Sequence, residues 1–306
     1  MGNKIDYDRS AEVLSLCQSN YIAEMFRKFL SGSNTILWST PVGTTEKDIE
    51  AWHNLSEATD AVDASRVGSK QYTSVMGSIL YAACMTRPDI AYHSSYLCQF
   101  MQNPSSACYD AALGLISYLY KTRHLKLTYG DVSLTDSQIQ MGFDPDNFRK
   151  NAGLHCYFDS SFNRVPRPYC GYLVFFNGGV VSWSSKRLKL IPQSSCEAEI
   201  ATGAGACKDI QFCRQALEDL GFPICGPTPV VTDNSAAMST VQNPGVTART
   251  RHYERWIYYI RELYMRRVIT IHLEGTARMV ADILTKALNV KVAYYEFRRM
   301  CGLRST

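Results

Sequence analysis

The residues of this chain best suited to act together chemically are four acids that lie far apart in the sequence. Asp159 and Asp233 each end a short apolar run that predicts a buried strand. Glu199 lies near the start of a long helical stretch, and Asp282 lies in another helical stretch near the end of the chain. The acids therefore alternate between strand ends and helices, an order that allows them to converge at one edge of a sheet.

Converging carboxylates have a definite chemical use. Several carboxylates repel one another when ionised together, so divalent cations are needed to hold them in that state. Mg²⁺ prefers oxygen ligands, and two such ions ~3.5–4 Å apart can clamp the attacking and leaving oxygens of a phosphodiester. The chain has 28 acidic residues, however, and the spacing alone fits four unconnected surface acids equally well.

Composition describes an ordinary soluble protein. The 306 residues are enough for about two domains, and 46% hydrophobic with 20% charged residues is usual for globular chains. A net charge of +4 is a weak indication of an anionic partner. We find no apolar run of membrane-spanning length and no secretory signal at the start, so we expect a cytoplasmic or nuclear protein without a membrane partner.

The eleven cysteines do not have metal-site spacing. They contain no Cys-x-x-Cys pair, which argues against a zinc site. Their odd number and the apolar neighbours of Cys84, Cys156 and Cys207 predict reduced, buried thiols.

The first half of the chain is predicted to be mainly helical. Residues 1–18 predict a hairpin and residues 18–30 a helix, whereas residues 31–70 have little periodicity and predict a loop. Helical periodicity then covers residues 71–121, with interruptions at prolines. Residues 131–152 are polar and rich in turn formers, so they are the predicted linker.

After the linker, strands and helices alternate, which predicts an α/β fold. The predicted strands are residues 154–158, 169–176, 180–185, 229–233 and 268–273, and the predicted helices are residues 194–220, 249–267, 276–288 and 290–302. The first three strands follow one another closely and predict an antiparallel meander.

The segments around the acids carry a family resemblance. Together and in this order they resemble the ribonuclease H region of a copia-type LTR retrotransposon polyprotein. They are Tyr157-Phe-Asp-Ser-Ser-Phe162, Gly179-Val-Val-Ser-Trp-Ser-Ser-Lys186, Ser194-Ser-Cys-Glu-Ala-Glu199, Thr232-Asp-Asn-Ser-Ala-Ala237, Ala248-Arg-Thr-Arg-His252 and Val280-Ala-Asp-Ile-Leu-Thr-Lys286.

The resemblance extends upstream and implies a domain plan. Tyr72-Thr-Ser-Val-Met-Gly-Ser-Ile-Leu-Tyr81, Thr86-Arg-Pro-Asp-Ile-Ala91 and Tyr118-Leu-Tyr-Lys-Thr122 resemble the segment that follows the polymerase palm. It implies three parts: residues 1–130, the end of the palm with a helical thumb- or connection-like region; the linker; and residues 153–302, a ribonuclease H-like domain. That fold is a five-stranded mixed sheet flanked by helices, here preceded by a mainly α-helical domain.

The same resemblance implies a site and a reaction. Asp159, Glu199, Asp233 and Asp282 would be the catalytic, metal-binding acids, holding two Mg²⁺ ions, with Mn²⁺ as a possible substitute. The implied reaction is hydrolysis of the RNA strand of an RNA–DNA hybrid, without a covalent enzyme intermediate. Since a helix turns ~100° per residue, only one of Glu197 and Glu199 can face the other acids. The motif selects Glu199 and leaves Glu197 to complement the helix dipole.

A basic segment after the third acid is a candidate nucleic-acid surface. The residues assigned to it are Arg249, Arg251, His252 and Arg255. Its functional interpretation is a surface that follows phosphates beside the active site, and the alternative is a solvated helix face.

Several departures from the family pattern keep a second function open. Ser161 stands where the family often has another acid, residues 164–171 replace a Ser/Thr-rich run, and Gly203 and Gly205 are unusual in the helix. These fit a diverged copy, so the alternative is a catalytically inactive, domesticated nucleic-acid-binding remnant. The chain also lacks the Tyr-x-Asp-Asp turn and any adjacent Asp pair, so we expect no DNA synthesis by this chain alone. A separate palm-bearing chain remains open as a partner.

Overall fold

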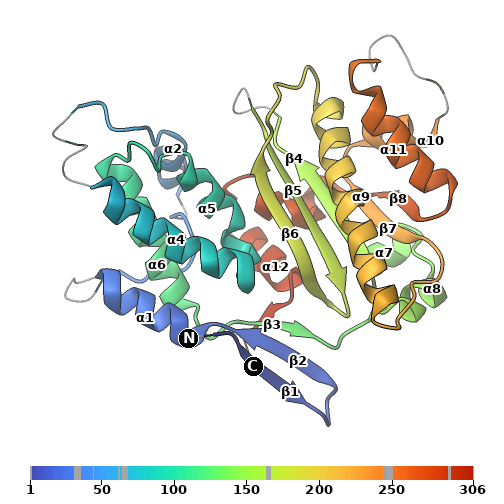
Figure 1. Cartoon of the computed structure of the whole chain (residues 1–306), viewed down its shortest axis with the longest axis horizontal. Helices are drawn as coiled ribbons and strands as arrows, with labels where there is room; N and C mark the ends of the chain where they lie inside the picture. Colours follow the sequence, from blue (N-terminus) through green and yellow to red (C-terminus); the bar gives the residue numbers. More distant parts are fainter. Residues whose placement is uncertain are drawn as a thin grey trace. The chain divides into compact units, whose positions relative to one another are not determined.

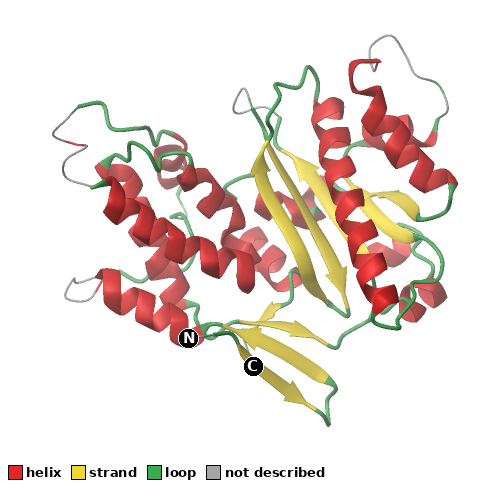
Figure 2. Ribbon diagram, in the orientation of Figure 1, coloured by secondary structure: helices red, strands yellow, loops and turns green. Residues whose placement is uncertain are grey.

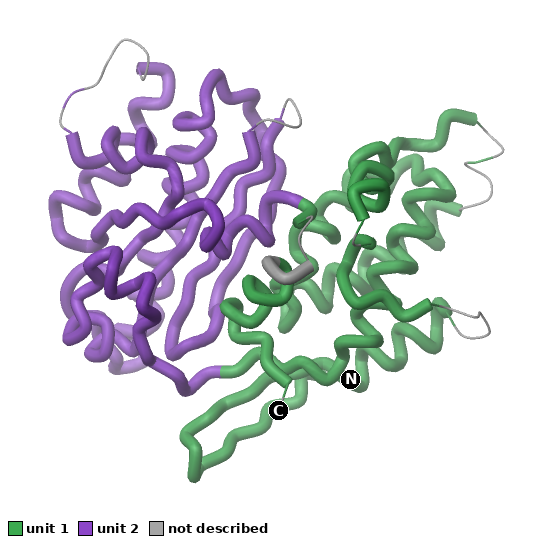
Figure 3. The backbone as a smooth tube through the Cα atoms, turned by 180° about the vertical axis from the view of Figure 1, so that it is seen from behind, with its two compact units in different colours: residues 1–128, 287–306 green, residues 129–286 purple. Residues whose placement is uncertain are grey.

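The computed structural model divides the chain into two compact units (Figure 3). It describes residues 2–30, 36–43, 45–60, 63, 68–162, 167–243, 245, 251–288 and 291–305. One unit contains residues 1–128 and 287–306, and the other contains residues 129–286. The predicted domain boundaries stay a prediction, but the units differ from them at one end. Residues 287–302 lie with the first unit and not with the ribonuclease H-like part.

The second unit is built on a five-stranded mixed sheet, which confirms the predicted fold class (Figures 1 and 2). The sheet order is β6-β5-β4-β7-β8. The first three strands pair antiparallel as the predicted meander, and β7 and β8 add parallel to β4. The strands are β4 (His155–Ser160), β5 (Tyr169–Phe176), β6 (Gly179–Arg187), β7 (Thr228–Thr232) and β8 (Ile269–Leu273).

The long helix α9 (Ser195–Asp219) packs against β4 and β5 across one face of the sheet (Figure 1). With α10 (Ser235–Gln242) and α11 (Glu254–Met265), it closes a core that includes Phe158, Ile200 and Ile257. Gly203 explains part of the unusual glycine pair, because a Cβ there would lie 3.1 Å from the Phe158 ring. At Gly205 the nearest atom would be at an ordinary 3.7 Å, and nothing in the structure requires glycine there.

The segment that carries Asp282 packs on the opposite face. Cys170 lies towards α9, and its neighbour Gly171 lies against Leu284, where a Cβ would come within 2.6 Å. The predicted α-helix over residues 276–288 is wrong in type. The structure has two short 3₁₀ segments, η3 (Thr276–Arg278) and η4 (Val280–Leu284). All five η4 residues are buried, so the segment has no polar face that would keep a longer helix at the surface.

The predicted linker is also different in the structure. Residues 131–152 belong to the second unit and contain α7 (Asp136–Gln140) and α8 (Pro145–Lys150). Caps define both helices: Thr135 and Gln138 form a capping box, and Asp144 caps a helix that begins with Pro145.

The first unit is mainly helical, as predicted, with a small four-stranded sheet of order β1-β2-β3-β9. The predicted hairpin and first helix are present as β1 (Lys4–Asp8), β2 (Val13–Cys17) and α1 (Ser19–Leu30). The predicted loop over residues 31–70 is corrected within its described part by α2 (Glu46–His53), which Thr45 starts with a capping box. The other elements of its described part are α4 (Ser69–Met85), η1 (Pro88–Ile90), α5 (Ala91–Cys98), α6 (Ser106–Lys121), β3 (Lys126–Tyr129), α12 (Lys291–Met300) and β9 (Leu303–Arg304).

Two further sequence expectations can be compared with the structure. Cys156 and Cys207 are buried free thiols as predicted, whereas Cys84 is exposed on α4. Over the described ranges, no helix is both long enough and apolar enough to cross a membrane.

Candidate active site

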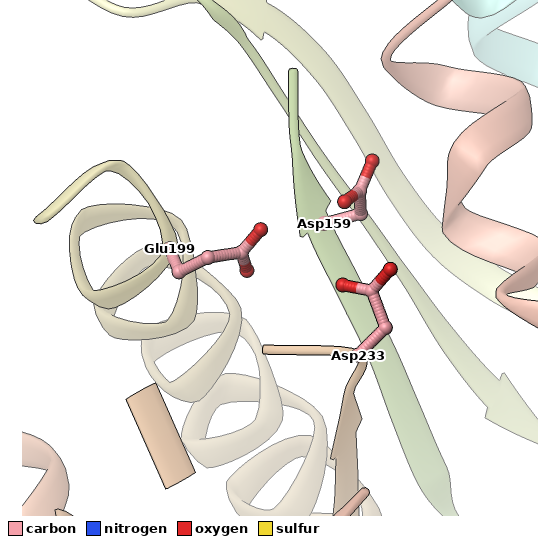
Figure 4. Close-up of side chains that lie close together, drawn as sticks. All are labelled: Asp159, Glu199 and Asp233. Atoms are coloured by element: carbon pink, nitrogen blue, oxygen red, sulfur yellow. The ribbon is translucent and has the colours of Figure 1, made fainter. Parts of the chain in front are cut away.

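Three of the four predicted acids meet at one edge of the second unit's sheet (Figure 4). Asp159 lies near the end of β4, Asp233 directly follows β7, and Glu199 extends from the first turns of α9. β4 and β7 are parallel with Tyr157 opposite Val231, so Asp159 and Asp233 are level with each other. One carboxylate oxygen from each of the three acids lies within 4.8 Å of the others.

Asp282 lies beside this group but is not one of the three. Burial and the charge of Asp159 raise the pKa of Asp282 to about 7. Its Oδ2 lies 2.8 Å from Lys286 Nζ. Its Oδ1 is buried and has no hydrogen-bond partner among the described residues. Asp282 is therefore next to the acid cluster. Its Oδ2 is paired with Lys286, and its Oδ1 has no hydrogen-bond partner among the described residues.

Hydrogen bonds from neighbouring residues fix the orientation of the acids. The Ser160 backbone N–H and hydroxyl donate to Glu199 Oε1 at 2.9 and 3.0 Å. The Thr285 hydroxyl donates to Asp159. These contacts join β4, α9 and the residues after η4, so the carboxylates are held by the fold before any ligand binds.

The cluster carries more negative charge than its surroundings neutralise. Burial, followed by the charge of Asp159, raises the pKa of Glu199 well above its ordinary value. The same two causes raise the pKa of Asp233. Lys286 is the one cationic side chain lining the pocket in the described part of the chain, against three acids there. Such a cluster is typical of a site that binds cations.

The acids open onto a pocket of about 570 Å³. Small polar groups complete its lining, from the end of β4 and from the starts of α9 and α10. They are Ser160, Ser161, Ser195, Asn234 and Ser235, and Phe162 also lines the pocket. The pocket lining thus combines three acids with several hydrogen-bonding groups.

Glu197 has the structural position that its sequence context predicts. Its backbone N–H donates to the Ser194 hydroxyl at 3.1 Å, and its Oε2 accepts from the Gln193 backbone N–H at 2.6 Å. His252 Nε2 lies 3.0 Å from the same Oε2. Glu197 therefore closes the start of α9 and faces His252, while Glu199 faces the other acids.

The structure describes only three of the four residues assigned to the predicted basic surface. Arg249 lies outside the described residues. Arg251, at the start of η2 (Arg251–Tyr253), and Arg255 on α11 are exposed, and His252 pairs with Glu197. None of these three lines the pocket. Their assignment to nucleic-acid binding stays a prediction.

Sequence reasoning missed three residues that hold the acids. Ser160, Thr285 and Lys286 each contact one of the four carboxylates. The signal for Lys286 was present, because it follows Asp282 by four residues within one of the family segments. Ser160 and Thr285 contact acids on other elements, which sequence spacing does not reveal.

The sheet order and the acids at its edge define the second unit as an α/β domain of the ribonuclease H-like class. Comparison with curated proteins extends this assignment. The chain is 28% identical over 94% of its length to a retrovirus-related Pol polyprotein from transposon TNT 1-94 of Nicotiana tabacum. It is 26% identical over 98% of its length to the corresponding polyprotein from transposon RE1 of Arabidopsis thaliana. The chain is a homologue of the retrovirus-related Pol polyproteins of plant transposons.

Three further findings qualify the comparison. The chain spans about a fifth of the length of these relatives, covering 20% and 19% of them. No family model matches it. A solved structure of LC11-RNase H1 in complex with RNA/DNA hybrid is similar at 16% identity over 43% of this chain and 93% of that one, with a TM-score of 0.35. The fold assignment rests on the strand order and not on that superposition.

Proposed function

We propose that the chain is a metal-dependent endonuclease that hydrolyses the RNA strand of RNA–DNA hybrids. The observation that carries the proposal is the convergence of Asp159, Glu199 and Asp233 within 4.8 Å, with Asp282 beside them. The homology to Pol polyproteins supports a nucleic-acid substrate. The chain has no Tyr-x-Asp-Asp turn, so the proposal does not include DNA synthesis.

The residues at the site fit divalent cations. All donors are carboxylate oxygens, which are the ligands that Mg²⁺ and Mn²⁺ accept. The raised pKa values of Glu199 and Asp233 indicate charge that the protein does not neutralise itself, and Asp282 Oδ1 is buried without a partner. Bound ions at these acids would supply positive charge that polarises water and the phosphodiester.

The protein's own contribution is positioning. Ser160 fixes Glu199 and Thr285 fixes Asp159, so these carboxylates cannot turn away when a substrate phosphate approaches. Lys286 lines the pocket and supplies a positive charge on the side of Asp282. Hydrolysis by an activated water needs no nucleophilic side chain, so the pocket serines serve as hydrogen-bonding groups.

The test is a cleavage assay on a hybrid whose RNA strand is labelled. We expect cleavage of the RNA with Mg²⁺ or Mn²⁺, no cleavage with EDTA, and no cleavage of duplex DNA. Asp233→Asn should abolish cleavage and leave hybrid binding nearly intact. If wild type and Asp233→Asn bind hybrid but are equally inert at high enzyme concentration, the non-catalytic binding remnant replaces this proposal.

A further inference from the structure

A long segment between two of the site's acids contains only one sign of charge. From Ser160 to Cys196 the chain has five basic residues and no Asp or Glu. Four of the five are described, and all four side chains are exposed. They are Arg167, Lys186, Arg187 and Lys189, which we name the cationic rim.

The pairing of β5 with β6 brings the residues of the rim to the same end of the two strands. Arg187 lies opposite Tyr169, and the Leu188 backbone N–H donates to the Pro168 carbonyl at 2.8 Å. Continuing that register by one residue places Lys189 opposite Arg167. The rim is therefore formed where β5 begins and β6 ends, from residues that are far apart in the sequence.

The placement of Arg167 opposite Lys189 has no evident use in folding. Like charges directly opposite each other on paired strands are destabilising. Among the described residues, no salt bridge involves Arg167, Lys186 or Lys189. An anion bound at the rim would relieve the repulsion.

The rim lies at the same end of the sheet as the acids. β4 ends, β5 begins and β6 ends at that edge, as can be followed in Figure 1. Ser160 pairs with Cys170, and Cys170 pairs with Lys186, so these three residues form one row across three strands. Adjacent strands are ~4.8 Å apart, which puts the Lys186 backbone roughly 10 Å from that of Ser160 in the pocket lining.

We infer that the cationic rim binds the phosphate backbone of a nucleic-acid duplex whose scissile phosphate lies at the acids. Phosphates of one strand are spaced ~3.4 Å along a duplex axis, so roughly 10 Å corresponds to about three base pairs from the cleaved bond. This surface lies on the β5–β6 hairpin and is separate from Arg251 and Arg255. The inference rests on the proposed function for the identity of the substrate.

The experiment compares two double variants of the full chain that remove the same charge. Lys186→Ala/Lys189→Ala changes the rim. The matched control is Lys150→Ala/Lys208→Ala, two exposed lysines on helices of the same unit. Binding to a labelled RNA–DNA hybrid is measured in EDTA over a range of salt concentrations, with circular dichroism to verify folding.

Each phosphate contact contributes about 0.9 to the slope of log affinity against log salt. In the rim variant, the magnitude of this slope should therefore fall by about two. Its affinity for hybrid at low salt should be lower by about tenfold or more. The control should match wild type. Replacing the phosphate about three positions from the cleaved bond with a neutral methylphosphonate should weaken wild type and leave the rim variant unchanged.

Equal losses in the rim and control variants would overturn the inference, because they would show a general charge effect. So would a rim variant that binds hybrid like wild type but loses binding to anionic lipid vesicles. Cleavage is scored separately. If the wild-type chain cleaves hybrid but the rim variant has the same salt slope as wild type, the rim inference is refuted and the proposed function stands. If the wild-type chain does not cleave hybrid but the salt slope falls in the rim variant, the rim inference stands and the proposed hydrolysis is refuted.

Discussion

Each compact unit buries a cluster of ionisable side chains, and the two clusters treat their charge in opposite ways. In the first unit, Arg87 donates to Asp89 from Nε at 2.9 Å and from Nη2 at 2.7 Å. The hydroxyls of Tyr118 and Tyr294 also donate to Asp89. Burial alone would raise the pKa of Asp89, but Arg87 and the hydrogen bond from Tyr118 hold it below its ordinary value.

The second unit's cluster has acids without an equivalent partner. Glu199 receives hydrogen bonds from Ser160, yet burial and Asp159 still hold its pKa well above the ordinary value. Lys286, the one cation that lines the pocket among the residues that the structure describes, pairs with Asp282. The difference therefore lies in neutralisation and not in burial, since both clusters are buried.

The comparison separates structural from functional use of buried charge. A bidentate Arg–carboxylate pair with its remaining lone pairs satisfied requires nothing from outside the protein. A buried group of acids with raised pKa values destabilises the fold until a cation binds, and such groups cluster at functional sites. Substitutions in the two clusters should accordingly affect different measured quantities.

The largest expected effect is on catalysis. Glu199→Gln keeps the size of the side chain and removes the charge that would hold a cation, so cleavage should slow by on the order of 10³-fold or more, about 4 kcal/mol in activation free energy. In EDTA its stability should equal or exceed that of wild type, because a repelling charge is gone. Single-turnover kinetics and thermal unfolding measure the two effects. A variant that loses stability in EDTA without losing cleavage would place Glu199 with Arg87 and Asp89 as a structural group.

Asp89→Asn should show the reverse behaviour. It leaves the fully buried Arg87 without its counter-charge, which typically costs about 3–5 kcal/mol of stability. Denaturant unfolding followed by circular dichroism measures the loss, and Mg²⁺ should not change it. Arg87→Met/Asp89→Leu should cost less than Asp89→Asn, because it removes both charges. A loss below about 1 kcal/mol for Asp89→Asn would show that water reaches this cluster.

The pH dependence in EDTA should also have opposite signs in the two clusters. The folded-state pKa of Asp282, about 7, lies above the ordinary aspartate value of ~3.9. The stabilisation that protonated Asp282 gives to the fold is therefore fully present below about pH 4 and is lost as pH rises through about 7. Asp89 has a lowered pKa, so the stabilisation that its ionised carboxylate gives to the fold is present above about pH 4. That stabilisation is lost as pH falls further.

Thermal unfolding in EDTA between pH 3 and pH 8 tests this difference. Asp282→Asn should flatten the decline in stability between about pH 4 and pH 7, and Asp89→Asn should leave that decline in stability unchanged. A wild-type chain whose stability rises over that interval would contradict the raised pKa of Asp282.

Much of the second unit could be predicted from sequence because its elements have clear periodicity. The meander strands alternate in burial or are fully buried, and α9 carries a long apolar face bounded by Ser194 and Gly221. The elements that were missed are specified by caps or by distant contacts. α10 follows β7 directly and is started by the Asn234 side chain, which accepts from Ala237 N–H. β3 and β9 are far apart in the sequence, and their pairing depends on the fold.

The candidate site divides in the same way. The order of the acids came from the family segments. Helix geometry allowed only one of Glu197 and Glu199 to face the other acids, and the resemblance to the family motif selected Glu199. Spacing indicated that Lys286 could pair with Asp282, but it could not show that this pair lies at the edge of the group, because that depends on the 3₁₀ segment η4. The Thr285–Asp159 hydrogen bond connects residues 126 positions apart and appears only in the folded chain.

The smallest expected effect belongs to Glu197, two residues from Glu199 on the same helix. Its carboxylate accepts the Gln193 backbone N–H and faces His252, so it supports the start of α9 and contacts none of the acids. Glu197→Gln keeps an oxygen that can accept the same hydrogen bond but removes the charge at the positive end of the helix dipole. It should cost at most about 1 kcal/mol of stability and change the cleavage rate by less than about fivefold. Kinetics of Glu197→Gln beside Glu199→Gln decide the register of the helix, because the two charges removed are equal and only their direction differs. If Glu197→Gln slowed cleavage more than Glu199→Gln, the catalytic carboxylate on α9 would be the one that faces His252.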